Sequence, residues 1–135
     1  MTTTLLAALT AERDKRRRDA EDVATRREVG RAVLQAVAQR LNSEPVSGWS
    51  FIPRGDEIIV ARTSGGVGSR QHVATWIVDS EMRLVLDQEM TEWITAESCA
   101  RVVDEAVRIT ARFILDTEAR MQPLRRELSE YAQRG

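Results

Sequence analysis

Three glycines fall within four positions of the segment ARTSGGVGSRQHV, residues 61–73, and such a run can either cradle a phosphate or turn the chain. A Walker-type phosphate loop needs a lysine and a hydroxyl residue directly after its last glycine, followed by a helix whose N-terminus faces the phosphate. Here Gly68 is followed by Ser69 and Arg70 and then by a strand pattern. Because glycine supplies the positive φ angles of tight turns, the segment predicts a hairpin connection.

The single histidine, His72, is the remaining candidate for acid–base chemistry. With one histidine and one cysteine, Cys99, the chain lacks the ligands of a zinc cluster. A general base also needs a nucleophile or a substrate pocket beside it, and no nucleophile motif accompanies His72. We therefore predict no catalytic, metal-binding or cofactor-binding residue, and we keep a small enzyme or ligand binder around His72 as a third hypothesis.

Four acidic side chains surround another predicted hairpin, where paired carboxylates could share a proton or hold a divalent ion. They are Asp79, Glu81, Asp87 and Glu89. The alternative is that they are solvated hairpin residues. The tripeptide RGD, residues 54–56, matches an integrin-binding sequence by three residues only, and we interpret its glycine as a turn residue.

The most basic stretch of the chain is DKRRRD, residues 14–19, whose four consecutive cations could neutralise backbone phosphates. Acidic residues flank the run on both sides, which favours a solvated helix with ion pairs as the alternative. Three further arginines extend the basic surface along the same helix. The candidate nucleic-acid contacts are Lys15, Arg16, Arg17, Arg18, Arg26, Arg27 and Arg31.

Composition argues against a globally basic nucleic-acid binder. The chain has 20 basic and 21 acidic residues, and its formal net charge is −1. No window holds eighteen consecutive apolar residues, and the N-terminal segment lacks the order of a signal peptide, so we expect no membrane segment. A single cysteine provides no disulfide framework, and the expected location is cytoplasmic.

Helical spacing of apolar residues predicts a long helix near each end of the chain. Thr4 is placed to cap the first helix, and an apolar face runs from Val23 to Leu41 before the chain-breaking segment NSEPVSG. Residues 10–22 contain no apolar side chain larger than alanine, so we expect residues 1–22 to form a protruding, solvated extension. Three acid–base pairs at i,i+4 would support it. These pairs are Glu12 with Arg16, Asp14 with Arg18, and Asp22 with Arg26.

The second helix is predicted to follow Thr95 as N-cap and to carry one apolar stripe from Cys99 to Tyr131. Pro123 lies within that stripe, and we expect it to kink or break the helix, since proline lacks an N–H and clashes with the preceding turn.

The middle of the chain predicts four strands joined by short turns. The segments are WSFIP, EIIVART, QHVATWIV and RLVLDQEM, all rich in β-branched or aromatic residues. An antiparallel meander follows from the hairpin-length connections. In the third strand, alternation places His72 on the same face as Trp76, and Val73 on the opposite face.

Together these patterns predict a single α+β domain over residues 1–135: a long helix, a four-stranded antiparallel meander and a long helix kinked near Pro123. A helix of about forty residues is about 60 Å long, so its ends must extend beyond so small a body. Apolar residues near both helix ends then predict a protein interface. They are Leu5, Leu6, Leu9, Leu124, Leu128 and Tyr131.

The leading hypothesis is a non-enzymatic interaction protein, a helix-mediated homodimer that acts as an adaptor, scaffold or chaperone-like partner of another protein. The alternative is an architectural nucleic-acid-binding protein that uses the basic first helix. No motif identifies a family. The order of elements is similar to that of small bacterial nucleoid-associated proteins and, with an extra helix, of dimeric secretion chaperones, but a likeness of element order transfers no site.

Overall fold

The computed structural model describes residues 3–63 and 69–134, apart from the side chains of residues 123–125 and 134. Along the chain, one long helix precedes a run of five strands and a second long helix follows it. The elements are α1 (Leu5–Leu41), β1 (Trp49–Arg54), β2 (Glu57–Thr63), β3 (Arg70–Val78), β4 (Arg83–Leu86), β5 (Glu89–Trp93) and α2 (Cys99–Arg134). The strands form one antiparallel sheet in the order β1-β2-β3-β4-β5. This is the predicted α+β fold.

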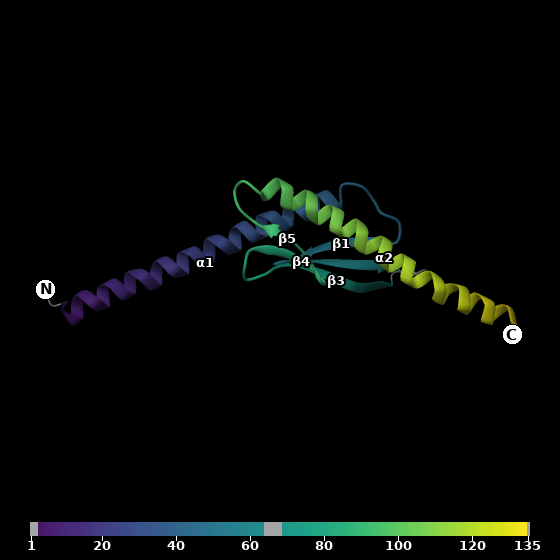
Figure 1. Ribbon diagram of the computed structural model, residues 1–135, viewed down its shortest axis with the longest axis horizontal. Helices are drawn as coiled ribbons and strands as arrows, with labels where there is room; N and C mark the ends of the chain where they lie inside the picture. The colour runs from purple at the N-terminus through teal and green to yellow at the C-terminus, as the bar shows by residue number, and fades with distance from the viewer. Residues whose placement is uncertain (1–2, 64–68, 135) are drawn as a thin grey trace.

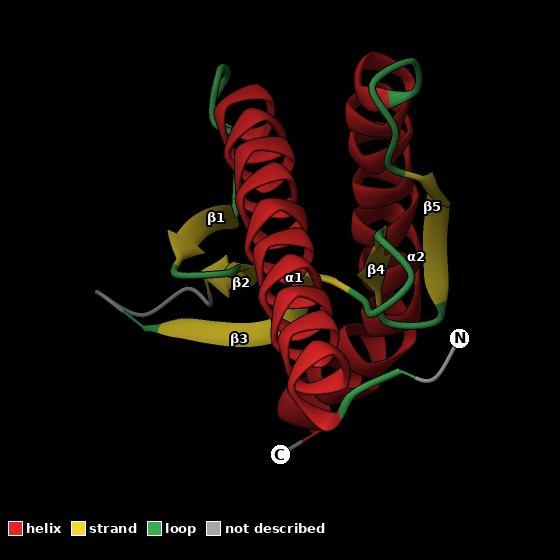
Figure 2. Ribbon diagram, turned by 90° about the vertical axis from the view of Figure 1, so that its left-hand side faces the viewer, coloured by secondary structure: helices red, strands yellow, loops and turns green. Residues whose placement is uncertain are grey.

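Both helices lie on one face of the sheet, and their free ends extend in opposite directions (Figure 1). Seen from the N-terminal end, α1 lies over β1, β2 and β3, whereas α2 lies over β4 and β5 (Figure 2). The opposite face of the sheet has no covering layer among the described residues, and Ile77 of β3 is exposed there. The chain is therefore a two-layer body with a helical arm at each end.

The first helix begins directly after Thr4, the predicted N-cap. The hydroxyl of Thr4 accepts a hydrogen bond of 3.2 Å from the backbone N–H of Ala7, and the helix ends at Leu41. It is continuous over 37 residues, about 56 Å, as predicted. None of the three predicted i,i+4 pairs forms among the described residues; Arg17 bonds to Asp14 instead.

Residues 5–29 of α1 form an extension, here called the α1 arm. All of them are exposed except Asp14, which is half-buried, and the first buried residue of the helix is Gly30. The arm is about 37 Å long at 1.5 Å per residue. Only the last third of α1 has buried residues. The apolar face expected to begin at Val23 is buried only from Gly30 onward, because Val23 and Val29 lie beyond the sheet and are exposed.

The prediction of four strands is wrong by one. The predicted fourth strand, residues 83–90, contains both β4 and the start of β5, which pair antiparallel through Leu86 and Glu89. Asp87, between them, has a φ of 56°, a left-handed conformation that aspartate tolerates in tight turns. No glycine marks this turn in the sequence, so the residue pattern predicts one continuous strand across it.

A β-bulge in β3 changes the predicted direction of His72. The register between β2 and β3 shifts between Val60 and Ala61, which leaves Val73 as an extra residue in β3. A bulge breaks the alternation of side chains along a strand. Val73, predicted to lie on the face opposite Trp76, packs against the core, while His72, predicted to share the face of Trp76, is exposed.

The second helix starts with a reciprocal cap. The backbone N–H of Ser98 donates to the hydroxyl of Thr95 (3.1 Å), and the backbone N–H of Thr95 donates to the hydroxyl of Ser98 (2.8 Å). Pro123 does not break α2, which continues to Arg134. A proline removes one helical hydrogen bond, and here the remaining bonds keep the helix intact. Residues 118–134, whose described side chains are all exposed, are called the α2 arm. At its base, the carboxylate of Glu118 still accepts a hydrogen bond of 3.0 Å from the indole N–H of Trp49 in β1.

The core lies between the inner face of the sheet and the buried parts of both helices. Its fully buried aromatic residue is Trp76, whose indole N–H donates to the hydroxyl of Thr110 on α2 at 3.0 Å. That hydroxyl in turn donates to the backbone carbonyl of Ala106 (2.8 Å). Trp49 packs edge to face with Phe113 of α2, with ring centroids 6.3 Å apart. The two tryptophans therefore bind α2 to the sheet.

Replacing Thr110 with valine should lower the free energy of unfolding by about 1–3 kcal/mol, because the buried indole N–H of Trp76 loses its acceptor while the shape of the site is kept. Chemical denaturation measures the change. Thr25→Val is the matched control, since the hydroxyl of Thr25 makes the same bond to a backbone carbonyl at an exposed position of α1. Equal stability of the two variants would contradict the role given to this hydrogen bond.

Candidate functional site

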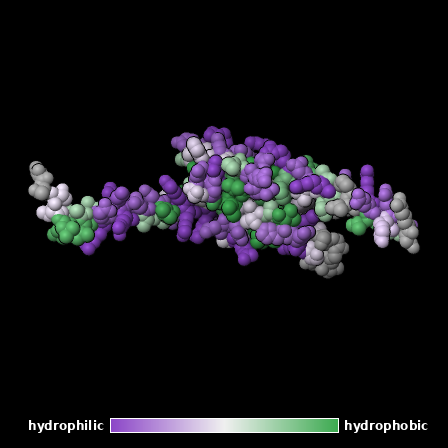
Figure 3. All heavy atoms as spheres, turned by 60° about the horizontal axis from the view of Figure 1, so that its bottom comes forward, coloured by the Kyte–Doolittle hydropathy of each residue, from purple (hydrophilic) through white to green (hydrophobic). Residues whose placement is uncertain are grey.

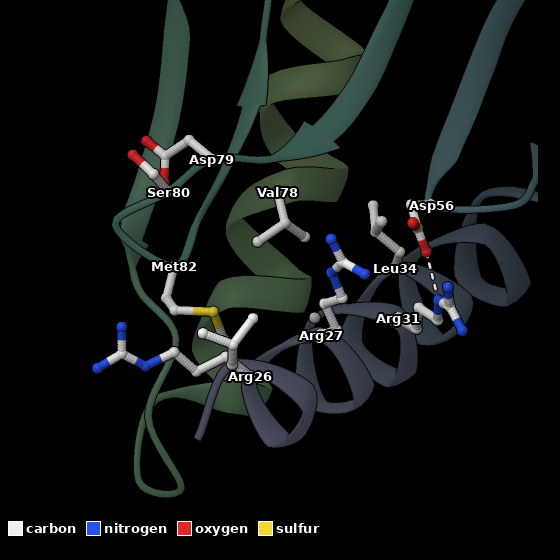
Figure 4. Close-up of a pocket in the computed structure, with 11 residues that line it drawn as sticks. Arg26, Arg27, Arg31, Leu34, Asp56, Val78, Asp79, Ser80 and Met82 are labelled. Carbon is white, nitrogen blue, oxygen red and sulfur yellow. Dashed lines mark hydrogen bonds and ion pairs between the residues drawn. The ribbon is translucent and has the colours of Figure 1, made fainter. Parts of the chain in front are cut away.

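A hollow in the described surface lies where α1 leaves the sheet (Figure 4). Its volume is about 320 Å³, within the usual range of ligand pockets. Its walls come from α1, the β1–β2 turn and the β3–β4 turn. The lining residues are Val23, Arg26, Arg27, Gly30, Arg31, Leu34, Asp56, Val78, Asp79, Ser80 and Met82.

One wall of the hollow is held by an ion pair between α1 and the β1–β2 turn. The guanidinium of Arg31 donates to the carboxylate of Asp56. Gly55, at φ 59°, provides the predicted turn that brings Asp56 to this position. The hydrogen bond from Arg31 lowers the pKa of the Asp56 carboxyl below its ordinary value of 3.8, and the same hydrogen bond raises the pKa of Arg31.

Two further cations on the rim have no hydrogen bond or ion pair with the described residues. Arg27 points into the hollow between Val78 and Leu34, whereas the guanidinium of Arg26 points away from it (Figure 4). The acidic Asp79 on the opposite wall is already paired with Arg83 at 3.1 Å. The hollow therefore combines an apolar floor with unpaired positive charge, which suits an anionic group with an apolar body.

The floor of the hollow depends on Gly30. A Cβ atom at this position would lie 3.2 Å from a methyl carbon of Val78, closer than ordinary contact. A glycine in mid-helix costs helical stability relative to alanine, and here it allows α1 to approach β3 closely. Gly30 and Val78 both line the hollow.

The structure brings together three of the seven candidate nucleic-acid contacts, namely Arg26, Arg27 and Arg31. The other four, residues 15–18, are consecutive in the exposed α1 arm. Consecutive helical residues are rotated by about 100°, so these four cations point to all sides of the helix. One straight phosphate backbone cannot contact all of them.

The predicted interface residues lie at the two far ends of the molecule. Leu5, Leu6, Leu128 and Tyr131 are well exposed, at 77%, 71%, 67% and 80%, and Leu9 is less so. Figure 3 shows apolar atoms gathered at the tip of the α1 arm, separated by a polar stretch from the body. Within one chain the two groups do not bury each other, because the helices extend in opposite directions. The side chain of Leu124 lies outside the described structure.

No acid–base or metal site forms around the other candidates. The ring of His72 bonds to the hydroxyl of Thr75 (2.6 Å), and both lie on the sheet surface. Of the hairpin acids, Asp79 and Glu81 pair with Arg83, and Glu89 pairs with Arg112. Within residues 3–63 and 69–134 there is no group of three or more metal-ligating side chains.

The glycine-rich segment at residues 64–68 lies outside the described residues. Thr63 and Arg70, at either side of it, pair antiparallel, so the segment connects neighbouring strands of the sheet. It is followed by a strand, which lacks the helix N-terminus of a phosphate loop.

The sequence matches no known family model, and the comparisons find no similar curated protein or solved structure. Neither α1 nor α2, the two helices in the described part of the chain, has an apolar stretch that could cross a membrane.

Sequence reasoning missed the part of the hollow that comes from the sheet. The sequence predicts a turn at Asp56 and a strand that ends at Val78, but it places neither beside α1. Helical spacing could group the arginines of α1, but no local signal places the two hairpin turns beside them. That proximity is set by the packing of Gly30 on Val78.

Because the folded-state pKa of Asp56 is below the unfolded value, the ion pair stabilises the fold above pH 3.8, and its contribution is lost as pH falls through the folded-state pKa. An NMR titration of the Asp56 carboxyl carbon should give a midpoint below 3.8 in the wild type. Arg31→Gln should move the midpoint upward. Arg26→Gln should leave it in place, since Arg26 does not contact Asp56. An unchanged midpoint in the Arg31 variant would show that another group lowers the pKa of Asp56.

Proposed function

We propose that this chain is a non-enzymatic protein-interaction module that acts as a homodimer in the cytoplasm, with exposed helix arms that form the dimer and receive a protein partner as an adaptor, scaffold or chaperone. The observation that supports this most directly is the area of its surface. A compact monomer of 15.2 kDa exposes about 7,100 Å². This chain exposes 10235 Å², an excess of about 3,100 Å².

This excess is larger than the surface that one chain gives to a stable dimer. Obligate interfaces bury about 2,000–5,000 Å² in total, or about 1,000–2,500 Å² from each chain, so the surplus surface could supply a whole interface. The excess comes from the two arms, which make no packing contact with the body along most of their length. Leu5 and Leu6 on one arm and Leu128 and Tyr131 on the other expose large apolar groups, which monomeric proteins rarely gather in this way.

Light scattering should give a mass of twice 15.2 kDa for the wild type across a dilution series. Two variants then identify the arm that holds the dimer: Leu5→Gln/Leu6→Gln/Leu9→Gln for the α1 arm and Leu128→Gln/Tyr131→Gln for the α2 arm. At least one should be monomeric with an unchanged circular dichroism spectrum, because all five residues lie outside the core. A wild type that remains monomeric at the highest concentration would rule out this function.

A second candidate function is architectural binding of nucleic acid, favoured by the unpaired Arg26 and Arg27 beside the basic α1 arm. The same light-scattering experiment with nonspecific duplex DNA tests it at low and physiological salt. Arg16→Glu/Arg17→Glu/Arg18→Glu should leave folding intact, because these side chains are exposed, and it should abolish a salt-sensitive complex. Binding that survives the triple change would exclude a role for this run.

A further inference from the structure

We propose that two copies of the chain pair through their α2 arms, antiparallel and about a two-fold axis level with residue 126, and that this helix pair is the dimer contact. The inference rests on the proposed function, since it specifies the surface through which the homodimer forms. It is carried by the apolar stripe of the α2 arm and by the symmetry of that stripe.

The stripe continues the buried face of α2 past the edge of the sheet. Phe113 packs on the core, and the half-buried Thr117 follows it at the edge. Beyond them, apolar residues recur in steps of three, four and three. They are Met121, Leu124, Leu128 and Tyr131. These steps are the a and d positions of a heptad repeat, which place all four positions on one face of a helix.

The stripe is self-complementary when the second helix runs in the opposite direction. About a two-fold axis at residue 126, position 121 lies level with position 131 of the second copy, and position 124 with position 128. Each level then joins an a position to a d position, which is how antiparallel helices interlock. Met121 then faces Tyr131 of the second copy, twice by symmetry. A symmetric contact of this kind closes at two copies.

The α1 arm offers a poorer surface for the same purpose. The face that continues toward its tip carries Glu12, Arg16 and Asp19 between Leu9 and Val23. Burying these charges in a helix pair would remove water from each of them. This costs free energy unless every charge is paired with an opposite charge. The face of the α2 arm carries no charge at its four heptad positions, so water leaves apolar surface only.

The α2 arm is long enough for the contact. Its 17 residues, 118–134, span about 25 Å, so the four apolar levels fit between the two bodies. In this arrangement the α1 arms and their hollows remain free at the outer ends of the dimer, where a partner could reach them.

Leu128→Glu tests the contact, with Leu115→Glu as its matched control. Both leucines lie on α2 and are similarly exposed, at 67% and 65%, but Leu115 lies on the side of the helix away from the stripe. Leu128→Glu should raise the dimer dissociation constant by on the order of 100-fold or more, since two apolar contacts are lost and two carboxylates are desolvated per dimer. Leu115→Glu should leave the dissociation constant within about twofold of wild type.

Cysteine cross-linking tests the register. In a Cys99→Ser background, the double variant Met121→Cys/Tyr131→Cys should form a covalent dimer under mild oxidation, as should a mixture of the two single variants. Positions 121 and 131 of one chain are about 15 Å apart along the helix, too far for a disulfide within the chain. Each single variant alone should stay uncross-linked, because antiparallel pairing does not bring a position next to its own copy.

The possible results separate this inference from the function on which it rests. A dimer that survives Leu128→Glu would overturn the α2 contact but not the homodimer, which would then form through another surface. The α1 arm would be the next surface to test. Cross-linking of either single variant alone would overturn the antiparallel register. A monomeric wild type would overturn both the inference and the proposed function.

Discussion

The mismatch in length between the helices and the sheet governs the rest of this structure. The longest strand, β3, has nine residues and spans about 30 Å, whereas α1 and α2 have 37 and 36 residues and span about 55 Å each. A sheet of this size can cover only part of each helix. Since both helices cross the same face and leave it in opposite directions, each must carry a segment without a partner. Every candidate interaction surface of the chain follows from that surplus.

The covered parts of the helices are held by a small, well-defined core. Trp76 lies at its centre, and its hydrogen bond to Thr110 satisfies the polar atom that a buried tryptophan brings with it. Gly30 allows α1 to lie close against Val78 at the end of the central strand β3. Because these contacts fix how both helices lie on the sheet, they also set the directions in which the arms leave the body.

The two arms differ in chemistry, and the proposed function gives them different roles. The α1 arm is charged along most of its length. Where it joins the body, it lies beside a hollow with an apolar floor and unpaired arginines. The α2 arm is apolar along one face as far as Tyr131. An apolar helix face favours a symmetric contact with its own copy, whereas a cationic hollow favours an anionic group on a different partner. Dimer formation and partner binding can therefore use opposite ends of the same chain.

The sequence alone determined the elements whose signals are local. Thr4 and Thr95 as caps and the turn at Gly55 were predictable, because a cap or a positive φ depends on a few neighbouring residues. Tertiary structure decided the rest. The turn at Asp87 and the bulge that exposes His72 depend on strand pairing, and the meeting of Arg31 with Asp56 depends on how α1 packs on the sheet. Such contacts join residues far apart in the chain, and no spacing rule within one segment can specify them.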